Sequence, residues 1–183
     1  MFGQLLKWIA CDGGPHLILP REVLCDWQAC DASCFARLPP YDGPTDYARA
    51  CTIALEREVG IICVGGMSGL VVGGEVPMST WIARDDRCGG DLVVALEWGR
   101  DAADDDILAS LAELQDESLR QEDLHISVGQ GGLVHFAACD RPPRWVYSHH
   151  EAPIRPGTYQ IASEVCSADP VDFRVHRLSL VMD

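Results

Sequence analysis

Short blocks in which apolar residues alternate with polar ones, or run together, follow one another along most of the chain. Between residues 59 and 96 they read VGIICVGG, GLVVGG, MSTWIA and DLVVALEW. Such runs predict β-strands. Gly-Gly doublets beside the runs supply the positive φ angles that tight turns need, so hairpins are expected. Pro77 cannot donate to a strand ladder, so the strand after it is expected to start late or to lie at an edge.

The last third of the chain returns to the same pattern. LHISVGQGGLVHF is predicted to form a hairpin, and GTYQIASEV and FRVHRLSLV are predicted to be two further strands. The segment CDRPPRWVYSHHEAPIRPG between them predicts a long Pro-rich connection.

Three segments have helical spacing instead. REVLCDW begins after Pro20, and TDYARACTIALE begins at Thr45, a residue that favours the N-cap. DAADDDILASLAELQDE repeats leucine and isoleucine with a period near 3.6 and opens with acidic residues, which stabilise a helix N-terminus. No repeat, low-complexity tract or domain boundary is evident. We therefore predict an α+β fold over residues 1–183, a single domain with a mainly antiparallel sheet of hairpins and two or three helices.

Composition places the chain among globular proteins, with 48% hydrophobic and 23% charged residues. No apolar run is long enough to span a membrane, and the N-terminus lacks the pattern of a signal peptide, so a cytoplasmic location is expected. The 28 acidic residues against 14 basic ones give a net charge of −14. Such a surface repels nucleic acid and anionic lipid, so a macromolecular partner is expected to be a basic protein.

Nine cysteines occur without a CxxC pair, which argues against a disulfide framework or a zinc site. The spacing of Cys25, Cys30 and Cys34 resembles half of a metal site, but a second ligand pair is missing. We expect these residues to be buried free thiols, and we expect no metal or other cofactor.

Catalytic motifs are incomplete wherever they are suggested. Ser68 lies in GMSGL, which does not match the nucleophile elbow GxSxG, and no glycine-rich loop matches a phosphate-binding motif. His149 and Glu151 match the first half of a zinc deaminase signature without the PCxxC that completes it. No catalytic residue is therefore predicted. Trp27, Trp81 and Trp98 lie in apolar runs and are expected in the core.

Five stretches of the sequence resemble those of a known protein family. They are the opening LLKWIACDGGPHLILPREVLCDW, the TDYARAC segment, the LVVGGEVPMSTW run, and the closing GTYQI and FRVHRLSLV runs. Together they resemble the immunity proteins of bacterial polymorphic toxin systems, specifically the twenty-first named immunity family, which is marked by a Trp and a GGP motif. The resemblance implies a small cytosolic protein, encoded beside a toxin, that binds and neutralises that toxin. The residues that match the family's pattern are Trp8, Asp12, Gly13, Gly14, Pro15 and Trp81.

An acidic domain without catalytic motifs suits an inhibitor of a basic enzyme, because complementary charge accelerates encounter. Two segments are candidates for toxin contact, an acidic helical stripe and an Arg-aromatic loop. Their residues are Asp106, Glu113 and Glu117 in the stripe and Arg141, Arg144, Trp145 and Tyr147 in the loop. A solvated helix face and an ordinary connection are the structural alternatives. A small enzyme with a Cys/His site and an acidic protein-binding adaptor remain alternative functions. The CDGGP stretch itself is predicted to be a structural turn.

Overall fold

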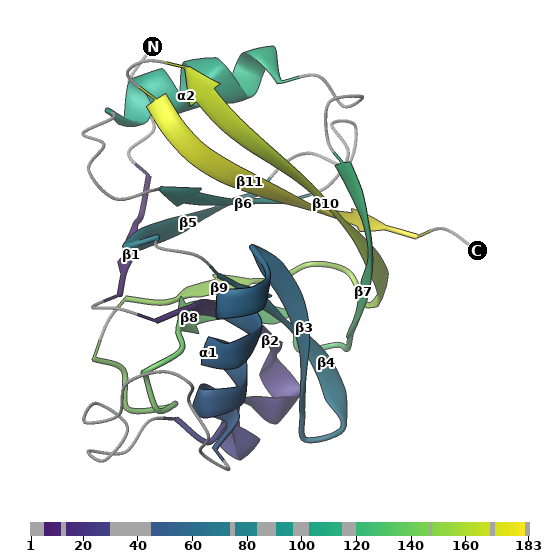
Figure 1. The fold of residues 1–183 in the computed structure, drawn as a ribbon. Helices are drawn as coiled ribbons and strands as arrows, with labels where there is room; N and C mark the ends of the chain where they lie inside the picture. The colour runs from purple at the N-terminus through teal and green to yellow at the C-terminus, as the bar shows by residue number, and fades with distance from the viewer. Residues whose placement is uncertain are drawn as a thin grey trace.

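The computed structural model describes residues 6–11, 14–29, 45–73, 76–83, 91–96, 103–114, 120–146, 148–168 and 171–181. In this part of the chain two antiparallel sheets pack face to face, and a helix covers the outer side of each (Figure 1). The arrangement confirms the predicted α+β class.

Each sheet takes strands from distant parts of the chain. Sheet A has the order β1 (Ile9–Ala10), β5 (Met78–Ile82), β6 (Asp91–Leu96), β11 (Val171–Leu180), β10 (Gly157–Ala168) and β7 (Arg120–Val128). Sheet B has the order β3 (Val59–Val64), β4 (Met67–Val72), β2 (His16–Pro20), β8 (Leu133–Ala137) and β9 (His150–Ala152). The helices are the 3-10 helix η1 (Arg21–Asp26), α1 (Asp46–Glu56) and α2 (Asp104–Glu113).

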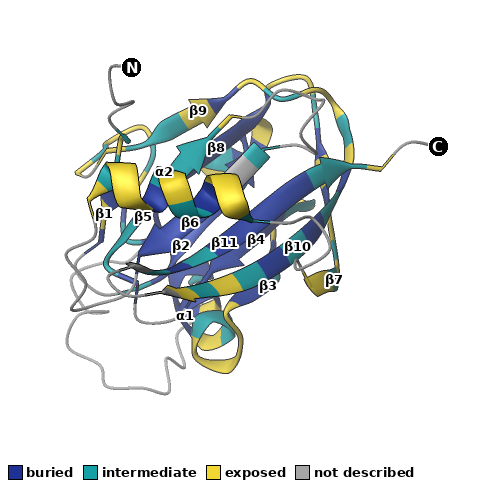
Figure 2. Cartoon of the chain, turned by 90° about the horizontal axis from the view of Figure 1, so that it is seen from above, coloured by how far each residue is buried: buried dark blue, intermediate teal, exposed yellow. Residues whose placement is uncertain are grey.

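Three apolar layers hold these elements together. Ile18 and Ile161 are fully buried between the two sheets. Phe136 and Tyr47 lie in a second cluster between sheet B, η1 and α1, and Ile107 joins α2 to the outer face of sheet A. Figure 2 shows the central strands largely dark blue, whereas the outward side of α2 is yellow. Burial of each such side chain contributes about 1.5–3 kcal/mol.

Local signals in the sequence correctly predicted several boundaries. Thr45 caps α1, because its side-chain oxygen accepts a hydrogen bond from the Ala48 amide at 3.2 Å. β5 starts at Met78, directly after Pro77, which confirms the late start. Gly66 has a φ of 81° in the turn between β3 and β4, as the glycine doublets predict.

The predicted hairpin LHISVGQGGLVHF is wrong. Its two halves are strands, but β7 pairs with β10 in sheet A, whereas β8 pairs with β2 and β9 in sheet B. The turn between them is fixed from outside, since Glu22 Oε1 accepts a hydrogen bond from the Gly131 amide at 2.9 Å. Both strands direct apolar residues, Ile126 and Leu133, into the layer between the sheets. The alternating pattern therefore predicts the buried face of each strand and leaves its partner open.

Two other expectations need correction or qualification. Cys25 is exposed rather than buried, because it lies on the outer side of η1, and Cys30 and Cys34 lie outside the described residues. Trp27 is buried as expected, Trp81 is half-buried, and Trp98 lies outside the described residues. Among the helices described, none has the length and hydropathy needed to cross a bilayer.

Candidate functional site

The acidic residues predicted on α2 lie on its solvent side. Asp106 and Glu113 are exposed, whereas Ile107 is buried against sheet A. Ser110 donates its hydroxyl to the Asp106 carbonyl at 3.0 Å, so this polar side chain is engaged by its own helix. Glu117 lies outside the described residues. The described part of the stripe is thus a solvated acidic face.

The arginines predicted in the connection after β8 lie at a tight turn, residues 141–146, which we call the arginine turn. The Arg144 amide donates to the Arg141 carbonyl at 2.7 Å, and the two residues form an isolated antiparallel bridge. Both residues are exposed, whereas Tyr147 lies outside the described residues. The bridge places the two arginine backbones side by side.

A buried aspartate and an aromatic cluster support the arginine turn. Asp140 is 1% exposed; its Oδ1 accepts a hydrogen bond from the Val146 amide at 2.9 Å, and its carbonyl accepts one from Trp27 Nε1 at 3.2 Å. Trp145 is half-buried, with its ring T-shaped to Phe136 at 5.4 Å and stacked on His149 at 4.1 Å. Trp145 is therefore a support of the turn rather than a free aromatic side chain.

The acidic stripe and the arginine turn lie on different sides of the molecule. α2 packs on the face of sheet A that points away from sheet B. The arginine turn packs, through Trp145, against the cluster of α1 and η1 on the outer face of sheet B. Figure 1 shows α1 and α2 at opposite ends of the layered fold. The two candidate surfaces therefore do not form one continuous patch.

The family-pattern residue Trp8 belongs to a segment that joins several elements, the N-terminal strap (residues 6–11 and 14–15). Trp8 Nε1 donates to Asp104 Oδ1 at 2.9 Å, and the Leu6 amide donates to the other carboxylate oxygen at 2.8 Å. Asp104 is the first residue of α2. One carboxylate thus ties the strap to the start of that helix.

Lys7 extends the strap across the seam between the two sheets. Its carbonyl accepts a hydrogen bond from Thr80 Oγ1 of β5 at 2.8 Å and another from His150 Nε2 of β9. Its Nζ donates to the His149 carbonyl at 2.9 Å. β5 belongs to sheet A and β9 to sheet B, so Lys7 links the two sheets at one edge of the sandwich.

The GGP part of the motif packs against α1. Gly14 has a φ of 134°, and a Cβ at this position would lie 3.0 Å from the Tyr47 hydroxyl. The Pro15 carbonyl accepts a hydrogen bond from the Ala138 amide at 3.0 Å. Asp12 and Gly13 lie outside the described residues. The described motif residues thus make structural contacts, and the structural turn of the CDGGP stretch stays a prediction.

We expect Gly14→Ala to lower the free energy of unfolding by about 2 kcal/mol, because alanine disfavours this φ and its methyl group meets the Tyr47 hydroxyl. Gly66→Ala is the matched control: Gly66 also has a positive φ, but a Cβ there would meet nothing within 4 Å. Urea denaturation measures both. Equal losses for the two variants would contradict a role for the Tyr47 contact.

Two buried serine–histidine pairs bear on the enzyme alternative. Ser79 Oγ and His135 Nε2 are hydrogen-bonded at 2.8 Å, and Ser163 Oγ and His176 Nδ1 at 2.9 Å. His135 Nδ1 has no hydrogen-bond partner among the described residues, so no carboxylate there orients its ring as in a catalytic triad. Ser79 and His135 are both 0% exposed. A nucleophile in this position is out of reach of a substrate.

Burial also determines the protonation of these histidines. Desolvation lowers the pKa of His135 well below its usual value, and the neighbouring His16 and His150 lower it further. Desolvation lowers the pKa of His16 to about 4, with the Val76 backbone acting in the opposite direction, and that of His176 to about 4, with Arg174 adding to the effect. Trp81 lies beside this group, its ring 6.3 Å from that of His135. All three histidines are neutral near pH 7.

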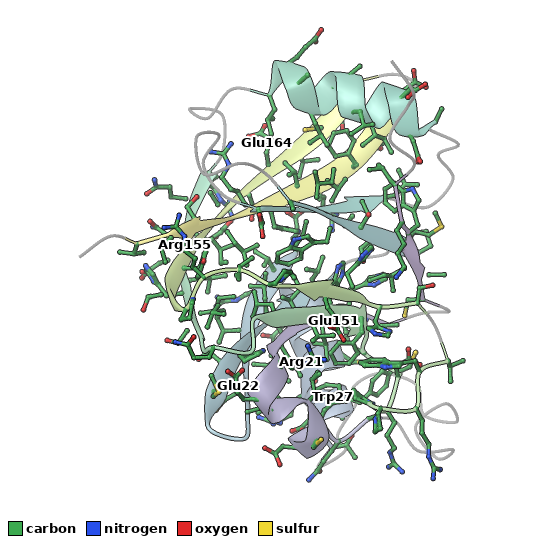
Figure 3. All side chains as sticks on the ribbon, turned by 180° about the vertical axis from the view of Figure 1, so that it is seen from behind. Arg21, Glu22, Trp27, Glu151, Arg155 and Glu164 are labelled. Atoms are coloured by element: carbon green, nitrogen blue, oxygen red, sulfur yellow. The ribbon has the colours of Figure 1, made fainter. Side chains whose placement is uncertain are left out.

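His149 and Glu151, which match the first half of a zinc deaminase signature, each contact a different part of the protein. Glu151 forms a two-point ion pair with Arg21 of η1, with distances of 3.0 and 3.1 Å (Figure 3). His149 is stacked on Trp145. No group of three or more His, Cys, Asp or Glu side chains within the described ranges is arranged to hold a metal ion.

Asp104 and Asp140 carry contacts that the sequence does not predict. Asp104 is one of three consecutive aspartates that suit a helix N-terminus, and nothing in that run distinguishes the one that binds Trp8 and Leu6. Asp140 directly precedes the arginine turn, and an aspartate before RPP is a usual turn signal. That signal could have identified Asp140 as a turn residue but not its bond to Trp27, which lies far away in the sequence.

Comparison with known proteins gives one match. The model of the family described as immunity protein 21 matches residues 7–171, a range that includes most of the strap, all of sheet B, the arginine turn, and sheet A as far as the first residue of β11. No curated protein and no solved structure matches the chain. Because the match covers most of the sequence, the chain belongs to the immunity protein 21 family.

Proposed function

We propose that the protein is a non-catalytic immunity protein that binds a cognate toxin protein in the cytoplasm and neutralises it. The observation that carries the proposal is the family match over residues 7–171. The toxin is expected to be encoded beside this protein and to be produced by the same bacterium. Neutralisation by binding requires a complementary surface and no reactive group.

The family-pattern residues that the structure describes make contacts within the protein, which fits a role in folding rather than in catalysis. Trp8 and Gly14 contact α2 and α1, and Pro15 is hydrogen-bonded to the residue that follows β8. Trp81 faces the buried histidines. These residues maintain a scaffold, so toxin recognition falls to exposed residues elsewhere on the molecule.

Net charge supports a basic toxin. The protein carries a charge of −14, and the exposed side of α2 contributes to its negative field. A field of this sign attracts a basic partner and raises the rate of encounter.

We expect the association rate with the toxin to fall about tenfold or more when salt is raised from low to high concentration, because ions screen exposed charges beyond about 10 Å at 0.1 M. Stopped-flow fluorescence measures this rate. The dissociation rate serves as the internal control, since screening affects it much less. A constant association rate would contradict the electrostatic part of the proposal only.

Co-expression tests the proposal as a whole. The flanking open reading frame is expressed alone and together with this protein, and the complex is recovered on an affinity tag. Toxicity that is relieved by this protein, together with a stable complex of the two chains, is the expected result. A harmless neighbour that forms no complex would contradict the proposal.

A further inference from the structure

The two arginines of the arginine turn, Arg141 and Arg144, differ in their ion pairing from most of the other described arginines. Arg21, Arg49, Arg120 and Arg174 each pair with a carboxylate of the same chain. The guanidinium groups of Arg141 and Arg144 pair with no carboxylate among the described residues, although acidic residues outnumber basic ones by two to one. Two donors for carboxylates are therefore left available at one turn.

Backbone geometry keeps these two donors together. The bridge between Arg141 and Arg144, with its 2.7 Å hydrogen bond, holds the two residues side by side. Both side chains start from this turn and are exposed to solvent. Each guanidinium can bind a carboxylate in a two-point arrangement that a lysine cannot make.

The turn is held from beneath by residues of other elements. Asp140 fixes the Val146 amide and is itself held through its carbonyl by Trp27, while Trp145 packs on Phe136 and His149. Of these six residues, only Trp145 and Val146 belong to the turn itself. A loop held in this way loses little conformational freedom when it binds, which favours affinity.

An apolar contact point lies next to the arginines. Val146 is 80% exposed, more than any other large hydrophobic residue in the described chain. Its amide is fixed by Asp140, so the exposed side chain is presented from a constrained backbone. Arginine is enriched at protein-binding surfaces, and the exposed Val146 side chain adds apolar area beside the two arginines.

We propose that Arg141, Arg144 and Val146 form the anchor that binds acidic side chains of the toxin. This inference rests on the proposed function and names the surface of contact. The negative field of the protein attracts a basic toxin from a distance, and the arginine turn then pairs with carboxylates at the site of contact. Such pairing fixes the orientation of the complex and slows its dissociation.

Charge reversal at the anchor tests the proposal. The toxin encoded by the flanking reading frame is titrated with wild-type protein, Arg144→Glu, the double variant Arg141→Glu/Arg144→Glu, and Val146→Asp. Arg57→Glu is the matched control: it makes the same change of charge at an exposed arginine, at the C-terminal end of α1, that pairs with no described carboxylate. Thermal unfolding of every variant monitors folding, and substitutions at these exposed positions should leave the melting temperature nearly unchanged.

We expect the double variant to weaken binding roughly 30-fold or more, mainly through faster dissociation, and Arg57→Glu to change affinity less than threefold. Equal affinities of wild type and the anchor variants would overturn the anchor and leave the immunity function in place. Equal weakening by Arg57→Glu and Arg144→Glu would also overturn it, since the effect would then be one of overall charge. A wild-type protein that fails to bind the toxin would overturn the proposed function together with the anchor.

Discussion

Lowering the pH from 7 to 5 is expected to reduce the free energy of unfolding by about 4 kcal/mol or more, because His16 and His176 are buried as neutral side chains. Their pKa values are about 4 in the folded protein against 6.5 for the unperturbed group. As the pH falls below 6.5, the unfolded chain takes up protons that the folded protein excludes. Stability is therefore complete above pH 6.5 and is lost progressively toward pH 4.

The size of this effect follows from proton linkage. Each histidine with this shift loses about 1.4 kcal/mol per pH unit, or about 2 kcal/mol between pH 6.5 and 5. His135, whose pKa is also lowered by burial and by His16, adds to the loss. A domain stable by about 5–15 kcal/mol would thus lose a large part of its stability before most carboxylates titrate.

Urea denaturation at several pH values measures the effect. His16→Leu removes one titrating group and should reduce the pH dependence by about 2 kcal/mol over the same range. His125→Gln is the control for replacing a histidine, because His125 is exposed on β7 whereas His16 is buried. A wild-type free energy that is constant from pH 7 to 5 would show that these histidines are not held neutral by the fold.

Phe136→Ala is expected to cost about 3–5 kcal/mol of stability, the usual range for removing a fully buried phenylalanine. The ring is T-shaped to Trp27 at 6.2 Å and to Trp145 at 5.4 Å, so its loss leaves a cavity beneath the arginine turn. Phe136→Leu keeps most of the volume and should cost less than half as much.

Chemical denaturation gives the stability of both variants, and toxin affinity gives their effect on the anchor. If Phe136 supports the arginine turn, Phe136→Ala also weakens toxin binding under conditions in which the variant remains folded. Unchanged affinity would show that the turn keeps its conformation without this ring. A loss of stability below 1 kcal/mol would contradict the packing described for Phe136.

Elements with local signals were predictable from the sequence, as was the hairpin of β3 and β4 at its glycine doublet, whereas the pairing of strands distant in the chain was not. The helix at 46–56 follows from the Thr45 cap and from its apolar spacing, both contained within a dozen residues. β7 and β8 are adjacent in the chain and follow an alternating pattern, yet they belong to different sheets. Their partners, β10 and β2, are distant in sequence, so the choice depends on packing that no local pattern encodes.

In the candidate site, too, local composition predicted some features, whereas others depend on residues distant in the sequence. An arginine and aromatic composition in a Pro-rich loop identified Arg141, Arg144 and Trp145, and the exposure of the two arginines agrees with that reading. The supporting role of Trp145 depends on Phe136 and His149, which belong to other parts of the chain. Whether these residues, or Asp106 and Glu113 on α2, bind a toxin stays a prediction.

The interleaving of the two sheets along the chain has a consequence for synthesis on the ribosome. β2 gains its second neighbour only when β8 has emerged, more than a hundred residues later, and the central strand β6 must wait for β11, the last strand described. Folding that depends on such distant partners is slow, on the order of milliseconds to seconds. The nascent chain therefore exposes unpaired apolar strands until β11 has emerged from the ribosome, which makes it a natural substrate for chaperones.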